Sequence, residues 1–272
     1  MAFFDQFPKT TYQYENDGVP TQIIDLFRYV KIDEDFLDDV SVYQFYQVKN
    51  GERPDTVSYK LYGTPEYYWT FFIANAHLKE GLSAWPLSPD QFEDYMNDEY
   101  GGVVIDTEPT VVLTGDGLVS EYRNSVAGRF QVNELVTGMI SGATGYVKEK
   151  NAQMGQLILR DVTGTFVSGE FIRGATTLDE ITSSVVYNHR DAPHHFETDD
   201  GTVLYMAKYI NESNGDYSTG INVQPGTRPQ DLTAISYFQY ETQLNDERGN
   251  IRVVRPNVIY KFAQRFRELL NA

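Results

Sequence analysis

Histidine is the side chain of this sequence best suited to acid–base catalysis or metal binding, and four histidines are present. His194 and His195 are adjacent, whereas His77 and His189 stand apart. A zinc site needs ligands that converge on one point. Neighbouring side chains on a strand point to opposite faces, so we expect His194 and His195 to diverge. Because cysteine is absent, thiolate metal sites, disulfides and thiol catalysis are excluded. We predict neither a metal nor a cofactor.

Carboxylates are abundant, but no catalytic motif organises them. The sequence contains no G-x-S-x-G elbow, no Walker loop and no H-E-x-x-H. Glycoside hydrolysis needs two carboxylates about 5–10 Å apart, and among 39 acidic residues some pair would meet that spacing by chance. An acidic run over residues 33–39 lacks the central glycine of an EF-hand loop, so we favour a solvated face over a calcium loop. The sequence therefore predicts a protein that is not an enzyme.

Composition narrows the class of partner. The formal net charge of −17 argues against nucleic acid and against anionic membrane surfaces, because both require clustered Lys and Arg. No apolar run is long enough to form a transmembrane helix, and the first residues lack the pattern of a signal peptide. We expect a protein kept in a cytoplasm or in a particle assembled there. A hydrophobic share of 41% is sufficient for packed cores.

The elements that must position any site are most clearly marked in residues 46–75, the densest aromatic stretch. Residues 46–48 alternate like a short strand. Pro54 suits the first position of a helix, and Gly63 suits the left-handed residue that closes it. A second helix should begin with Thr64 as its cap. Its residues at three- and four-residue steps form one apolar face: Tyr68, Trp69, Phe72, Ile73 and Ala76.

This strand, the two helices and an expected return strand at residues 85–87 resemble a LysM-type module. Two motifs are more particular: Tyr62-Gly63-Thr64-Pro65-Glu66-Tyr67-Tyr68-Trp69 and Trp85-Pro86-Leu87-Ser88. They occur in order with further groups: Asp25-Leu26-Phe27-Arg28, Tyr240-Glu241, Asn245-Asp246-Glu247-Arg248 and Ile251-Arg252. Over residues 20–98 and 236–256 the chain resembles the baseplate wedge protein of T-even-type contractile-tailed phages, the gene product 53 family.

The resemblance implies a structural role in the sixfold baseplate of a contractile tail. In that family the protein joins wedge components to the sheath-initiating subunit and helps neighbouring wedges to associate. The expected partners are therefore other baseplate wedge proteins and the sheath-initiating subunit, with several copies in each virion. The LysM-like resemblance leaves a second hypothesis open, which is a glycan-binding module that attaches to bacterial cell wall. Its exposed rings would be Tyr67, Tyr68 and Trp69.

Residues 103–188 differ in character, because Gly and Thr become frequent and helical periodicity disappears. A repeat of the form F-x-x-x-E-x-[V/I]-x-G begins at Phe130 and again at Phe166. Short strands ended by glycine predict a small all-β barrel or sandwich inserted into the other fold. We interpret the repeated Glu134 and Glu170 as turn or surface residues, since no partner acid or base stands beside them.

The C-terminal part should contain a hairpin around Asp200-Gly201 and an extended loop over residues 211–232. Residues 237–240 and 251–254 should form strands joined by a turn. A last helix should follow Pro256, with Arg265 off its apolar face. We expect little of the chain to cover this face, so the candidate partner-binding site consists of its residues Ile259, Phe262, Phe266 and Leu269 together with the neighbouring Arg265.

The predicted fold class is α+β: a small LysM-like strand-helix-helix-strand module, an inserted all-β domain and extended terminal arms. The predicted division has four parts. They are an N-terminal arm (1–42), the LysM-like module with a following short helix (43–98), the inserted β domain (99–190), and a C-terminal hairpin, loop and helix (191–272).

Overall fold

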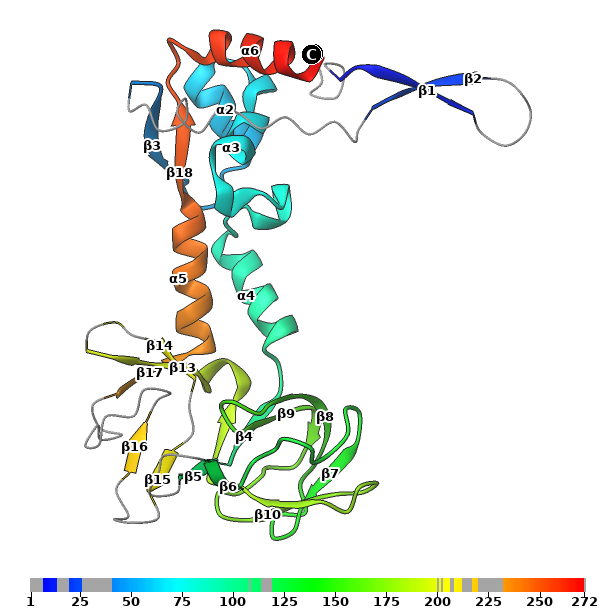
Figure 1. The fold of residues 1–272 in the computed structure, drawn as a ribbon, viewed down its shortest axis with the longest axis vertical. Helices are drawn as coiled ribbons and strands as arrows, with labels where there is room; N and C mark the ends of the chain where they lie inside the picture. The colour runs from blue at the N-terminus through cyan, green and yellow to red at the C-terminus, as the bar shows by residue number, and fades with distance from the viewer. Residues whose placement is uncertain are drawn as a thin grey trace. The chain divides into compact units, whose positions relative to one another are not determined.

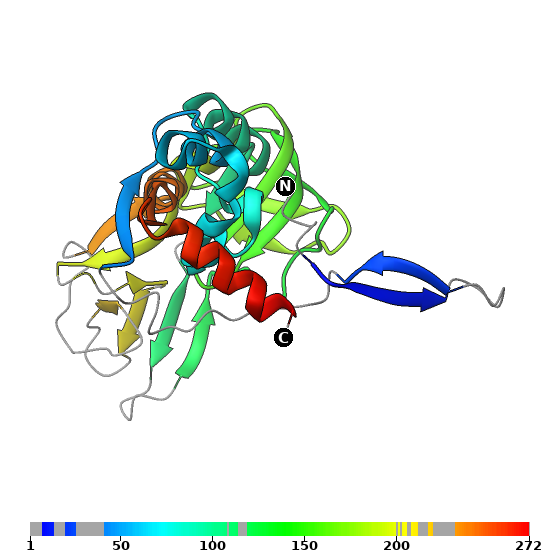
Figure 2. The same ribbon diagram turned by 90° about the horizontal axis from the view of Figure 1, so that it is seen from above.

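The chain has a mixed α+β fold, as predicted, with two compact units (Figure 1, Figure 2). The computed structural model describes residues 7–13, 20–25, 41–107, 109–113, 119–199, 201, 203–205, 208–211, 217–219 and 232–271. The acidic run at 33–39 and most of the loop predicted at 211–232 lie outside these residues. Unit 1 comprises residues 1–92 and 243–272, and unit 2 comprises residues 93–242. The predicted four-part division stays a prediction.

The N-terminal part of unit 1 contains a β-hairpin. Strand β1 (Lys9–Gln13) pairs antiparallel with β2 (Pro20–Ile24), with Thr11 opposite Gln22. All ten residues of the two strands are exposed. The hairpin therefore has no hydrophobic face buried against the described residues.

The strand and helices predicted from residues 46–75 are present as β3 (Tyr43–Gln47), α2 (Pro54–Tyr62), the 3₁₀ turn η3 (Pro65–Tyr67) and α3 (Trp69–Ala74). Gly63 ends α2 with a φ of 73°, and its N–H donates to the Tyr59 carbonyl at 2.9 Å. The Thr64 hydroxyl accepts from the Glu66 N–H at 3.3 Å and caps η3. The turn chemistry read from the sequence is confirmed at both positions.

The prediction that residues 85–87 form the return strand is wrong. The strand that pairs with β3 is β18 (Asn250–Val254), far along the chain, with Ile251 opposite Tyr46. After η4 (Ala76–Leu78) and η5 (Gly81–Ala84), Trp85 instead enters the core, and its indole N–H donates to the Glu52 carbonyl at 2.7 Å. A Trp fixed in this way, followed by a Pro with no N–H to donate, is poorly suited to a strand ladder.

The C-terminal part of the chain contains a second departure from the predicted elements. Residues 237–249 form the helix α5 (Tyr237–Gly249) rather than a strand and a turn. Its start is a capping box, because the Gln239 N–H donates to the Ser236 hydroxyl at 3.2 Å and the Ser236 N–H donates to the Gln239 side chain at 2.9 Å. The last helix, α6 (Ile259–Asn271), is where the sequence predicts it.

Unit 2 is built around a seven-stranded antiparallel sheet of order β11-β10-β7-β8-β9-β4-β12. It is preceded by α4 (Pro89–Glu99), which begins with a capping box, because the Gln91 N–H donates to the Ser88 hydroxyl and the Ser88 N–H donates to the Gln91 side chain. The strands of the sheet are β4 (Val103–Asp106), β7 (Leu135–Gly138), β8 (Thr144–Asn151), β9 (Gln156–Thr163), β10 (Phe171–Gly174), β11 (Glu180–Thr182) and β12 (Val185–Asn188). Two smaller sheets have the orders β14-β13-β17 and β16-β15-β5-β6. Their strands are β5 (Thr110–Leu113), β6 (Val119–Arg123), β13 (Pro193–Thr198), β14 (Val203–Leu204), β15 (Lys208–Asn211), β16 (Tyr217–Thr219) and β17 (Leu232–Ser236).

The sequence repeat places its two glutamates inside unit 2, which corrects their interpretation as turn or surface residues. Glu134 and Glu170 precede the paired strands β7 and β10 and are 4% and 0% exposed. The Glu170 carboxylate accepts from the backbone N–H groups of Ile140 and Ser141 in the turn after β7. Glu134 in the same way accepts from the backbone N–H groups of Thr176 and Thr177 in the turn after β10. Each repeat therefore caps the turn of the other.

The remaining motif positions serve this reciprocal arrangement. Phe130 and Phe166 are buried in the hydrophobic core of the sheet. A Cβ at Gly138 would lie 2.6 Å from both carboxylate oxygens of Glu170, and one at Gly174 would lie 2.5 Å from the nearer oxygen of Glu134. The glycine that ends each strand therefore leaves room for the other repeat's carboxylate.

Candidate interaction surface and buried polar clusters

The apolar face of α6 is covered by its own chain, so the expectation of an uncovered face is wrong. Ile259, Phe262 and Phe266 are 6%, 1% and 4% exposed. The Trp69 ring packs against Phe266 at a centroid distance of 4.6 Å and against Phe262 at 6.2 Å. The expectation rested on the extended, turn-rich chain before the helix, in which the partner of β18 could not be read from the sequence. Its pairing with β3 delivers α6 directly onto Trp69.

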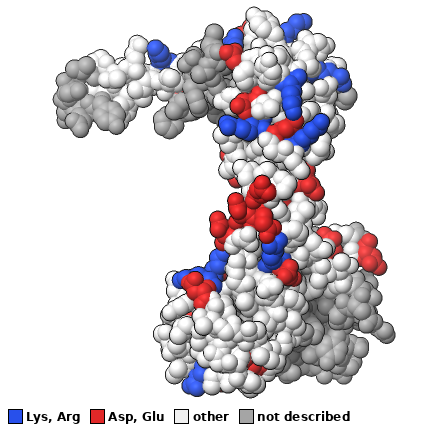
Figure 3. Space-filling view, turned by 180° about the vertical axis from the view of Figure 1, so that it is seen from behind, with Lys and Arg blue, Asp and Glu red and all other residues white. Residues whose placement is uncertain are grey.

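The two other candidate residues of α6 lie nearer the surface. Leu269 is half-buried, and Arg265 is exposed and forms an ion pair with Glu268 at 3.3 Å. Figure 3 shows Lys and Arg side chains among acidic ones on the face of unit 1 that it presents. The partner-binding role of these residues stays a prediction. Only residues on the exposed side of the helix could contact a partner, because the two phenylalanines are buried.

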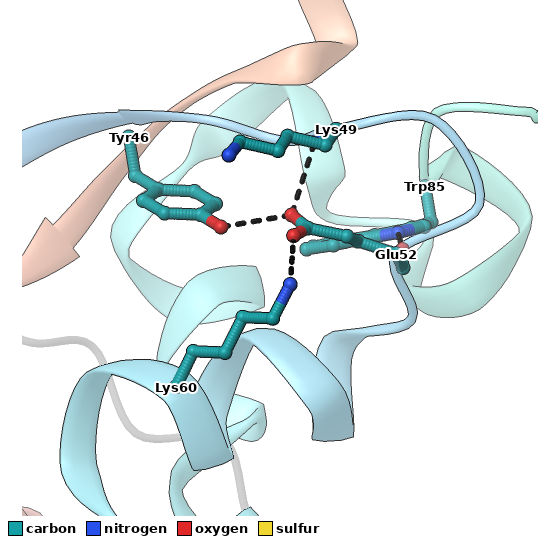
Figure 4. A network of polar contacts seen from close by, with 5 residues as sticks. All are labelled: Tyr46, Lys49, Glu52, Lys60 and Trp85. Carbon is teal, nitrogen blue, oxygen red and sulfur yellow. Dashed lines mark hydrogen bonds and ion pairs between the residues drawn. The ribbon is translucent and has the colours of Figure 1, made fainter.

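A partly buried polar network closes the corner between β3 and α2 (Figure 4). The Tyr46 hydroxyl donates to Glu52 at 2.8 Å, the Lys49 backbone N–H donates to the same oxygen at 3.0 Å, and the Lys60 ammonium donates to the other oxygen. Burial alone raises the pKa of Glu52, but the hydrogen bonds from Lys60, Lys49 and Tyr46 outweigh it and hold that pKa below its usual value. Burial and the neighbouring Glu52 raise the pKa of Tyr46 to about 12.

This arrangement suits a structural carboxylate rather than an acid–base catalyst. At neutral pH Glu52 is ionised and Tyr46 is protonated, so neither group is ready to exchange a proton. The backbone carbonyl of Glu52 also accepts a hydrogen bond from the Trp85 indole N–H. The residue therefore ties the β3–α2 turn to the core of unit 1, as the four connections in Figure 4 show.

The histidine pair of unit 2 does not diverge as predicted. A register shift in β13 between Pro193 and His195 turns both rings to the same side. Their Nδ1 atoms lie 2.8 Å apart, and the His194 ring stacks on Tyr240 at 3.9 Å between centroids. His195 also contacts Glu197 at 3.2 Å. Burial, together with the neighbouring His195, lowers the pKa of His194 to about 4.

His189 completes an aromatic cluster in unit 2. Its ring is 3% exposed and lies between Tyr100 and Tyr237, at centroid distances of 5.1 and 4.9 Å. Burial, and to a lesser degree the charge of Lys148, lowers the pKa of His189 to about 4. The Tyr100 hydroxyl donates to the buried Glu241 at 2.6 Å. Both His189 and His194 are therefore neutral at pH 7, as packed rings usually are.

Among the described residues, no three His, Asp or Glu side chains are grouped closely enough to hold a metal ion. No helix in the described part of the chain has the length and apolarity needed to cross a membrane. Hydrogen bonds and ring contacts connect the members of these polar clusters, although the two ring nitrogens of His189 have no hydrogen-bond partner among the described residues.

Comparison with known proteins identifies the N-terminal third of the chain. Residues 1–89 match the family model described as base plate wedge protein 53. The description is that of a structural component of a phage baseplate, not of an enzyme. No curated protein matches the sequence. The resemblance to the gene product 53 family inferred from the sequence is confirmed over residues 20–89, and the LysM-like resemblance stays a prediction. The matched segment ends before α5, β18 and α6, where the resemblance at residues 236–256 stays a prediction.

Proposed function

We propose that the chain is a structural component of the baseplate wedge of a contractile phage tail. The observation that carries the proposal is the match of residues 1–89 to the base plate wedge protein 53 family. This segment contains β3, α2 and α3, together with Glu52 and Trp69, which hold the core of unit 1. We infer the function from the family of this segment. The polar clusters described above do not suggest a chemical reaction.

The core of unit 1 extends this proposal beyond residues 1–89. Ile251 and Val253 of β18 pack with Phe71 and Trp85, and α6 packs on Trp69. The matched segment is therefore completed by residues from the C-terminal end of the chain. We propose that unit 1 as a whole performs the wedge role, and that the β-rich part of unit 2 is an insertion into a LysM-like strand-helix-helix-strand arrangement.

The partners proposed for unit 1 are other wedge proteins and the sheath-initiating subunit, with several copies in a sixfold baseplate. The mechanism is binding through exposed side chains. Exposed residues of α6 such as Arg265 are candidates for the rim of such a contact.

The alternative of glycan binding lacks a supporting observation. Trp69 is 3% exposed and packs on α6. Tyr67 and Tyr68 are half-buried, and their rings contact Tyr62 and Phe72. Rings used in this way have little free surface for stacking on sugars, so we prefer the assembly role.

The proposal is tested by blocking expression of the chain in the phage that encodes it and supplying it from a plasmid. We expect blocked cells to accumulate incomplete baseplates without contractile sheaths, and the plasmid to restore complete tails. A plasmid carrying Trp69→Asp, which places a charge in the core of unit 1, should not restore them, whereas the surface variant Tyr59→Asp should. Normal tails without the chain would refute the proposal.

A further inference from the structure

The β18-β3 sheet of unit 1 has one edge closed by side chains and one edge that is open among the described residues. On the β18 side, the Asn75 side chain takes the place of a neighbouring strand. The Arg252 N–H donates to Asn75 Oδ1 at 2.7 Å, and Asn75 Nδ2 donates to the Arg252 carbonyl at 2.9 Å. The next outward carbonyl, that of Val254, accepts the Tyr62 hydroxyl at 2.8 Å. The β18 edge is therefore satisfied by side chains of the same unit.

The β3 edge has no such cover. Val48 donates its N–H to Gly249, and Val42 accepts from the Arg255 N–H. Backbone groups alternate in direction along a strand, so the even-numbered residues of this segment face β18. The N–H and C=O groups of Tyr43, Phe45 and Gln47 consequently point away from β18. Within the described part of the chain, no residue bonds to them. Figure 1 shows β3 as the outer strand of this pair.

Side chains near this edge add an apolar surface to the open row of backbone groups. Phe45 is 65% exposed, although it lies at the middle of β3. It contacts Tyr43 edge to face at 5.8 Å, and the Arg252 guanidinium lies over the Tyr43 ring at 5.2 Å. An open edge with an exposed central aromatic residue is the kind of surface that pairs with another strand.

The same chain carries a hairpin that needs additional strands. All residues of β1 and β2 are exposed, and an isolated two-stranded hairpin is at best marginally stable in water. The Asp25 N–H donates to the Pro8 carbonyl, so the even-numbered residues of β1 face β2. Lys9, Thr11 and Gln13 therefore turn their backbone groups outward. The outer edge of β2 lacks one donor, because it begins with Pro20.

These two edges are complementary in length and in pattern. Each belongs to a five-residue strand and presents three outward residues, centred on Thr11 in β1 and on Phe45 in β3. We propose that the hairpin of one copy of this chain adds, through β1, to the open β3 edge of a second copy. The pairing would join two two-stranded sheets into one sheet of four strands, which satisfies both open rows and gives the hairpin the neighbours that it lacks.

The proposed partner of the β3 edge is a second copy of the chain, because the chain carries both open strand edges. Neither edge is paired within the described residues. The exposed apolar side chains of the hairpin include Ile23 and Ile24. They lie on β2, one strand away from the new pair, so the side chain opposite Phe45 would be that of Thr11 on β1, and β-branched and aromatic side chains are favourable cross-strand neighbours. The proposal concerns contact between copies and stands apart from which other subunits the chain binds.

Disulfide trapping tests the proposal directly, because the natural chain has no cysteine. One full-length chain would carry Thr11→Cys, and a second chain of different mass would carry Phe45→Cys. The proposed pairing is antiparallel, because only then do two central residues with outward backbone groups lie directly opposite each other, at a distance that a disulfide can span. We expect a mixed disulfide dimer under mild oxidation. Replacing Phe45→Cys by Tyr59→Cys, an exposed site on α2, should reduce the yield at least about tenfold.

Two outcomes of the trapping experiment would overturn the proposal. One is a yield of mixed dimer no higher than with the Tyr59→Cys control. The other is a closed monomer when Thr11→Cys and Phe45→Cys are placed in the same chain, which would show that the hairpin folds onto its own β3.

Sedimentation of proline variants provides a second measurement. Phe45→Pro removes an outward N–H and leaves the ladder to β18 intact, so it should weaken self-association about tenfold or more with little change in melting temperature. Gln44→Pro removes an inward N–H and should lower the melting temperature. A natural chain that remains monomeric at all concentrations, or a Phe45→Pro variant that associates like it, would contradict the inference.

Discussion

Trp69 of α3 and Phe266 of α6 lie in contact, with ring centroids 4.6 Å apart and planes inclined by 36°. They come from opposite ends of the chain, and both are almost completely buried. The contact fixes α6 as part of the core of unit 1. Stability of unit 1 should therefore depend on residues that lie far outside the segment matched by the wedge family.

Truncation of Phe266 tests this dependence. Phe266→Ala removes a buried ring, which typically costs about 3–5 kcal/mol, so the melting temperature of unit 1 should fall by several degrees. Tyr260→Ala on the same helix is the control, because Tyr260 is 68% exposed and its truncation should cost less than about 0.5 kcal/mol. Thermal denaturation followed by near-UV circular dichroism measures both. An unchanged melting temperature for Phe266→Ala would mean that α6 does not pack on Trp69 in solution.

The ionised carboxylate of Glu170 should contribute to the free energy of unfolding of unit 2. Its two oxygens accept from the N–H groups of Ile140, Ser141 and Val167 and from the Ser141 hydroxyl. Glu170→Gln replaces one acceptor by an amide group that faces N–H donors, and a buried unmatched donor costs about 1–3 kcal/mol. Glu180→Gln, an exposed site on β11, is the matched control. Urea denaturation should separate the two variants, and equal midpoints would contradict the capping role.

Acid should destabilise unit 2 in two steps. The first is protonation of a buried neutral histidine, and the second is protonation of two hydrogen-bonded carboxylates. The pKa of His189 falls from 6.5 to about 4 on folding, so the unfolded chain binds more protons between these values and stability decreases as the pH falls through this window. At about 1.4 kcal/mol per pKa unit, the loss is about 3 kcal/mol. The pKa values of Glu134 and Glu170 lie below 4.5, so their contribution is complete above pH 4.5 and is lost as the pH falls further.

His189→Phe removes the contribution of His189 and leaves that of His194, whose pKa is also lowered to about 4. A phenylalanine keeps the contacts with Tyr100 and Tyr237 and removes the titrating group. The variant should lose less stability than the natural chain between pH 6.5 and 4.5, and both should decline together below pH 4.5. If the two curves run in parallel from pH 7 to pH 5, the burial of a neutral His189 is not what makes the unit acid-sensitive.

Local signals could be read from the sequence where a turn or cap determines the element. Gly63 and Thr64 act as predicted, and a capping box at Ser88 marks the start of α4. The same motif at Ser236-Tyr-Phe-Gln239 marks the start of α5, and it was overlooked because the aromatic alternation around it was taken for a strand. A consistent search for capping boxes would have found this helix.

Non-local relationships could not be read in this way. The partner of β3 lies some two hundred residues along the chain, and no local pattern selects β18 over residues 85–87. The side-by-side placement of His194 and His195 depends on a bulge whose register is set by β17. The repeat was visible, but the reciprocal capping by Glu134 and Glu170 becomes evident only once β7 and β10 are seen to pair.

The central claim, that unit 1 is a structural part of a contractile-tail baseplate, is tested most directly by an electron cryomicroscopy map of the tail that contains this chain. The claim predicts density in the baseplate that fits β3, α2, α3, β18 and α6 as one body, with Trp69 against Phe266. A complete, well-resolved baseplate in which no density fits this unit would contradict it.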